Sequence, residues 1–73
     1  ILPLVPGLVE RLEEGGLEVL DLGCGAGRAV LEMARLFPRS RFTGADMNPE
    51  TIHAARRQAA AEGLANAVFL VQD

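Results

Sequence analysis

Short apolar stretches with two different periodicities alternate along this chain. Residues 17–22 form a nearly continuous apolar run, which is typical of a central strand buried on both faces of a parallel sheet. From residue 30 to residue 37, apolar side chains recur at intervals of three and four positions, which indicates one face of a helix, and Pro38 ends it. This part of the chain is therefore predicted to form a strand, a tight turn and a helix.

The same alternation extends over the rest of the chain. Residues 41–46 and 68–71 predict a second and a third strand, and Leu8–Glu14 predicts a short helix ahead of the first. A longer helix is predicted between the second and third strands, because Asn48 can cap a helix whose first position suits Pro49. Right-handed crossovers would place the strands side by side and parallel. The predicted fold class is α/β, with a parallel sheet between two layers of helices.

Length and composition indicate a piece of a larger domain. A domain of 73 residues buries only about 60% of its surface, and Cys24, the only cysteine, provides no disulfide framework. A buried parallel sheet also needs helices on both of its faces. We therefore expect this chain to hold only the first three strands of a larger sheet, with their helices, and not to fold alone.

The charge pattern gives no sign of a nucleic-acid partner. The net charge is −3, and the seven basic residues are scattered arginines, of which only Arg56 and Arg57 are adjacent, so no nucleic-acid-binding surface is predicted. No apolar run is long enough to span a membrane, and no signal-peptide pattern is present. The single cysteine favours a reducing compartment such as the cytoplasm. The sequence does not predict the oligomeric state.

The turn after the first predicted strand carries three glycines, Gly23, Gly25 and Gly27. Glycines at such a turn bring backbone amides and a helix N-terminus up to a ligand. Asp21 precedes them, and its carboxylate would repel a phosphate but suit a cationic amino group. The dinucleotide pattern Gly-x-Gly-x-x-Gly is not met, because Arg28 stands where its third glycine would be.

The chain has three aspartates, and each one falls at the end of a predicted strand: Asp21, Asp46 and Asp73. In a parallel sheet those ends share the edge at which open α/β folds bind ligands. Asp46 is placed to accept hydrogen bonds from two ribose hydroxyls, and Met47 to lie against an adenine ring. Asp73 is placed to accept from an exocyclic amine. Together these residues predict a ligand with an ammonium group, a ribose and an amino-bearing base.

With these residues the chain resembles, over residues 18–73, the first half of a class I (Rossmann-like) S-adenosylmethionine-dependent methyltransferase. The resemblance implies that residues 1–73 are the N-terminal part of a single S-adenosylmethionine-binding methyltransferase domain, and that Leu8–Glu14 partly covers the cofactor. It implies the following cofactor-binding residues: Asp21, Gly23, Cys24, Gly25, Gly27, Asp46, Met47 and Asp73.

The implied function is methyl transfer from S-adenosylmethionine to an unidentified small-molecule or macromolecular acceptor, and no residue here is assigned a catalytic role. Two other functions stay open: an NAD(P)-dependent oxidoreductase, and a non-catalytic protein that retains the fold. The site residues also have structural interpretations, as strand-end acids, turn glycines and, for Met47, a core methionine. Cys24 is interpreted as a small spacer near the cofactor and His53 as a surface residue, and no metal site is predicted.

Overall fold

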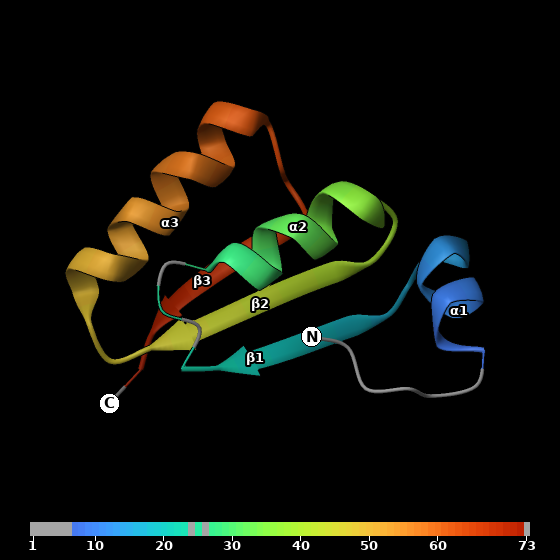
Figure 1. The fold of residues 1–73 in the computed structure, drawn as a ribbon, viewed down its shortest axis with the longest axis horizontal. Helices are drawn as coiled ribbons and strands as arrows, with labels where there is room; N and C mark the ends of the chain where they lie inside the picture. Colours follow the sequence, from blue (N-terminus) through green and yellow to red (C-terminus); the bar gives the residue numbers. More distant parts are fainter. Residues whose placement is uncertain (1–6, 24, 26, 73) are drawn as a thin grey trace.

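The computed structural model describes residues 7–23, 25 and 27–72 (Figure 1). Over these residues it contains the six predicted elements in the predicted order. Their bounds are α1 Leu8–Glu14, β1 Glu18–Leu22, α2 Arg28–Leu36, β2 Arg41–Asp46, α3 Pro49–Glu62 and β3 Ala67–Val71. The order of helices and strands, and the bounds of most of them to within a residue, are confirmed.

The three strands form one parallel sheet in the order β1-β2-β3. Two successive right-handed crossovers carry α2 and α3 to the same face of this sheet, where they lie side by side (Figure 1). The core lies between these helices and the strands. Its buried residues are Leu12, Val30, Leu31, Ala34, Phe42, Ile52, Ala55, Ala59 and Phe69.

Among the described residues, β1 does not show the burial on both faces that its apolar sequence predicts. Of these three strands β2 is the central one, and β1 lies beside it at one edge. Leu20 and Leu22 point to the face opposite α2 and α3 and are 61% and 67% exposed. Their apolar character predicted burial on both faces, but the two crossover helices cover only one face.

The position of α1 also differs from the expectation. The hydroxyl of Ser40, a buried residue between α2 and β2, donates a hydrogen bond of 2.9 Å to the carbonyl of Leu12. Nearby, the Gly16 amide donates to the carbonyl of Arg39 at 3.1 Å. These contacts hold α1 where the strands begin, at the opposite end of β1 from the glycine turn (Figure 1). The expectation that Leu8–Glu14 partly covers the cofactor is therefore wrong in this structure.

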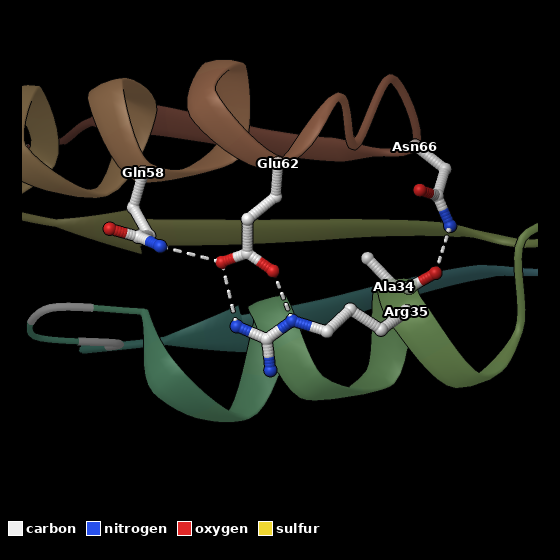
Figure 2. Close-up of polar contacts among 5 residues, drawn as sticks. All are labelled: Ala34, Arg35, Gln58, Glu62 and Asn66. Atoms are coloured by element: carbon white, nitrogen blue, oxygen red, sulfur yellow. Dashed lines mark hydrogen bonds and ion pairs between the residues drawn. The ribbon is translucent and has the colours of Figure 1, made fainter.

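Polar side chains tie α2 to the segment that follows it and to α3 and β3. The Asn66 amide nitrogen, just before β3, donates to the carbonyls of Ala34, Phe37 and Ser40 at 3.1, 3.1 and 2.9 Å. The first of these bonds is drawn in Figure 2. At Ala34 and Phe37, Asn66 therefore satisfies carbonyls that the end of α2 leaves without intrahelical partners, and at Ser40 it reaches the segment before β2.

A second tie joins the outer surfaces of the two crossover helices. Arg35 of α2 makes a bidentate ion pair with Glu62 of α3, and the Gln58 amide donates to the same carboxylate (Figure 2). The Arg35 guanidinium and the Gln58 amide lower the pKa of Glu62 to about 2. These contacts fix α2 and α3 relative to each other.

Candidate cofactor site at the carboxyl edge of the sheet

Asp21 is one of the last two residues of β1, and Asp46 is the last residue of β2. All three strands end at the same edge of the sheet (Figure 1). Asp21 lies opposite Gly44 in the parallel register, and Asp46 lies two residues beyond Gly44 on the neighbouring strand. Because side chains alternate along a strand, both carboxylates lie on the face that α2 and α3 cover. Both residues are half-buried. Both acids therefore lie at the edge where the strands end, as the strand order predicted, and their role as site residues stays a prediction.

The three glycines of the turn have different surroundings. All have positive φ, at 66° for Gly23, 58° for Gly25 and 74° for Gly27. A Cβ added to Gly23 or Gly25 would meet no atom of the described structure within 4 Å. A Cβ on Gly27 would lie 2.3 Å from Cε1 of Phe69 and 3.3 Å from Cβ of Ala55. The first two glycines therefore leave room for a ligand, and the third allows α2 to pack against the core.

The Asp46 carboxylate is held by backbone amides on both sides. Its Oδ2 accepts from the Gly25 amide at 2.8 Å, and its Oδ1 accepts from the Asn48 amide at 3.0 Å. These two amides, Asn48 first, hold the pKa of Asp46 below its ordinary value, against a smaller opposing effect of partial burial. The group is therefore ionised at neutral pH, as an acceptor of hydroxyl donors should be.

Asn48 makes hydrogen bonds through both its backbone and its side chain next to Asp46. Its amide contacts Asp46, and its side-chain oxygen accepts from the amides of Glu50 and Thr51 at 3.0 and 3.5 Å at the start of α3. The side-chain cap follows from residue type and position, as the sequence predicted. The amide contact was missed, because a backbone N–H is present at nearly every residue and carries no sequence signal.

Of the remaining predicted cofactor-binding residues outside the glycine turn, only Met47 is described by the structure. Met47 is 72% exposed, so it is not the core methionine of the structural interpretation and is free to contact a ligand beside Asp46. His53 is exposed, as interpreted from the sequence. Cys24 and Asp73 lie outside the described residues. Within the part of the chain that is described, no group of three or more His, Cys, Asp or Glu residues could hold a metal ion.

Two clefts in the described structure lie away from the carboxyl edge of the sheet. One cleft of about 670 Å³ lies where the strands begin and includes Arg39, Ser40 and Asn66 in its lining. Another, of about 600 Å³, lies between α2 and α3. Neither includes Asp21 or Asp46. The residue chemistry, and not the depth of a cavity, marks the carboxyl edge as the candidate site.

Comparisons with known proteins find methyltransferases. A family model described as "Methyltransferase domain" matches residues 13–73. The tRNA (guanine-N(7)-)-methyltransferase of Rubrobacter xylanophilus is 37% identical over 54 residues, which cover 74% of this chain and 24% of that protein. The release factor glutamine methyltransferase of Chlorobaculum tepidum is 33% identical over 70 residues, which cover 88% of this chain and 24% of that protein. The chain thus spans about a quarter of the length of these relatives.

Solved structures show the same fold. PKMT2 from Rickettsia typhi in complex with AdoHcy matches with a TM-score of 0.77 and 27% identity, covering 86% of this chain and 12% of that one. The [4+2]-cyclase SpnF matches with a TM-score of 0.75 and 29% identity, covering 90% of this chain and 26% of that one. The α/β fold is therefore the Rossmann-like fold of these enzymes, of which this chain covers a part. In the described residues no helix is both long and apolar enough to cross a membrane.

Proposed function

Because the chain belongs to the methyltransferase domain family, we propose that it forms the cofactor-binding half of an S-adenosylmethionine-dependent methyltransferase. One observation carries the proposal: the ionised Asp46 carboxylate stands at the end of β2 beside a turn in which Gly23 and Gly25 leave open space. A carboxylate at this place in an open α/β sheet accepts the hydroxyls of a ribose. The matching structure of PKMT2 contains AdoHcy, the product form of the same cofactor.

The residues present fit the polar parts of this cofactor. Asp46 accepts the two ribose hydroxyls, and Asp21, on the same face, attracts the ammonium group of the methionine moiety. The turn at Gly23 and Gly25 admits that moiety, because no side chain of the described structure would stand in its way. Gly27 serves this part of the site through packing, by holding α2 close to the core.

The adenine end is assigned to residues that follow the second and third strands. The exposed Met47 side chain lies against the adenine ring, since thioethers pack well on aromatic faces. Asp73 is assigned to the adenine amine from its position in the sequence after β3, and Cys24 to a spacer in the turn. When bound, S-adenosylmethionine supplies a methyl group on a sulfonium sulfur, and the protein supplies alignment.

The methyl acceptor is specified outside this chain. The two curated relatives share this segment, yet their names give different acceptors, a tRNA guanine and a release-factor glutamine. What these enzymes share here is therefore the handling of the cofactor. A nucleic-acid acceptor would contact other parts of the protein, because this segment has a net charge of −3 and scattered arginines. A cytoplasmic location stays a prediction from the single cysteine.

Calorimetric titration of the full-length protein with S-adenosylhomocysteine, with NAD as a parallel control, tests this function. We expect micromolar binding of the first ligand and none of the second. Asp46→Ala should weaken binding roughly tenfold to hundredfold, because hydrogen bonds to a charged acceptor are lost. Glu50→Gln is the matched control, since Glu50 is an exposed acid nearby whose side chain is no part of the proposed site.

The other possible outcomes of this titration would each indicate a different function. Binding of NAD alone would move the protein to the oxidoreductases. Binding of neither ligand by a folded full-length protein would favour a non-catalytic protein with this fold. Binding of S-adenosylhomocysteine without methyl transfer to any acceptor would favour a cofactor-binding protein of this fold with another activity.

A further inference from the structure

We propose that Asp46 is also a positioning residue, whose carboxylate latches the glycine turn to the end of β2 and so shapes the methionine pocket. This inference rests on the proposed function, because it concerns how the same cofactor site is built. The latch is the hydrogen bond of 2.8 Å from the Gly25 amide to Oδ2 of Asp46, across 21 residues of sequence. It joins the centre of the turn after β1 to the strand beside it.

The turn is anchored at both ends by other contacts. At its start, the Gly23 amide donates to the carbonyl of Ala45 at 2.7 Å and extends the pairing of β1 with β2. At its end, Gly27 is buried against Phe69. Gly25 lies midway, at a φ of 58°. The bond to Asp46 therefore fixes the centre of the turn at the place where backbone must approach the methionine moiety.

The latch and ribose binding can exist together. An ionised carboxylate has two oxygens with about four acceptor positions in total. The Gly25 amide occupies one position on Oδ2, and the Asn48 amide occupies one on Oδ1. The Met47 amide also lowers the pKa of Asp46, with a smaller effect than the other two amides. Even with all three amides counted, at least one of the four acceptor positions is left for a ribose hydroxyl. Asp46 can thus hold the turn before the cofactor arrives and keep holding it afterwards.

A ligand without ribose hydroxyls separates the two tasks of Asp46. We would titrate the full-length protein with S-adenosylhomocysteine and with its 2′,3′-dideoxy analogue, in wild type and in Asp46→Ala. If Asp46 positions the turn, the variant should bind the dideoxy analogue about tenfold more weakly than wild type does, although no hydroxyl is present. Asn48→Ala is the control, since it removes the side-chain cap of α3 but keeps the amide that contacts Asp46.

A spectroscopic measurement reads the latch directly. In ¹⁵N–¹H spectra of the isotope-labelled full-length protein, the Gly25 amide resonance should move as Asp46 titrates at low pH. It should keep that dependence with S-adenosylhomocysteine bound. The Gly63 amide, which donates to the carbonyl of Ala60 at the end of α3, should not follow this titration. A purely structural effect of Asp46→Ala would not create this link between one amide and one carboxylate.

The outcomes separate this inference from the proposed function. If Asp46→Ala weakens S-adenosylhomocysteine but not the dideoxy analogue, Asp46 acts only through the ribose, and the positioning role is overturned while the proposed function stands. If bound cofactor abolishes the pH dependence of the Gly25 resonance, the cofactor replaces the latch, and the role is likewise overturned. If wild type binds neither ligand, the proposed function fails and the positioning role falls with it.

Discussion

The close contact at Gly27 makes it the most sensitive glycine of the turn for stability. Gly27→Ala would place a methyl group 2.3 Å from Cε1 and 2.8 Å from Cζ of Phe69, a buried residue of β3. The backbone there also has a φ of 74°, which L side chains rarely adopt. Two separate penalties are therefore expected, one from the backbone and one from the clash.

The magnitude follows from adding the two penalties. A residue with a Cβ in the left-handed region costs about 1–2 kcal/mol. Extra volume in a packed core costs about 1–3 kcal/mol. Gly27→Ala should therefore lower the free energy of unfolding by roughly 2–5 kcal/mol, which corresponds to a Tm decrease of roughly 4–20 °C for a domain of 150–250 residues. Gly63→Ala isolates the backbone penalty, because its φ is 67° and no described atom lies within 4 Å of the added Cβ.

Thermal and urea unfolding of the full-length protein would measure these changes. Phe69→Leu removes the two ring atoms that the new methyl group meets, so Gly27→Ala should cost about 1–3 kcal/mol less in that background than in wild type. The reasoning is refuted if Gly27→Ala is no more destabilising than Gly63→Ala. It is also refuted if Phe69→Leu gives no relief, since the clash with the ring would then not be the cause.

Three further substitutions test contacts outside the turn. Ser40→Ala should lower the free energy of unfolding by about 1 kcal/mol in urea unfolding and increase proteolysis at α1, because the Leu12 carbonyl loses its donor. Asn66→Asp should cost about 1–3 kcal/mol in the same assay, because a carboxylate would face three carbonyl oxygens. Arg35→Ala should lower the Tm slightly and less at high salt, since the ion pair with Glu62 is solvent-accessible. The folded pKa of Glu62 is about 2 against an ordinary 4.5, so this Tm difference should be constant above pH 4.5 and vanish as the pH falls towards 2.

The elements could be predicted because each has a local signal. Asn48 and Pro49 set the start of α3 through a side-chain cap and a fixed φ, and both effects act within one helical turn. Gly63 has a φ of 67° after the last turn, where a helix commonly ends in the left-handed region. The convergence of Asp21 and Asp46 then followed from the parallel arrangement of the strands.

Contacts between distant residues could not be predicted in the same way. The position of α1 depends on the bond between Ser40 and Leu12, which are 28 residues apart. The exposure of Leu20 depends on which face the helices cover, whereas an apolar residue type only favours burial. The latch between Gly25 and Asp46 involves a backbone amide and has no residue signature. In each case the sequence indicates what a residue can do, and the tertiary structure selects its partner.

The different surroundings of the glycines also explain why Arg28 is tolerated after the turn. In a dinucleotide-binding turn, the third glycine of Gly-x-Gly-x-x-Gly allows close packing of the helix against the strand. Here Gly27 meets that need one residue earlier, because the space for its Cβ is filled by Phe69 and Ala55. Arg28 is consequently exposed at the first turn of α2. The spacing Gly-x-Gly-x-Gly thus combines two glycines that leave room for a ligand with one that packs α2 against the core, and the side chain of residue 28 is left exposed.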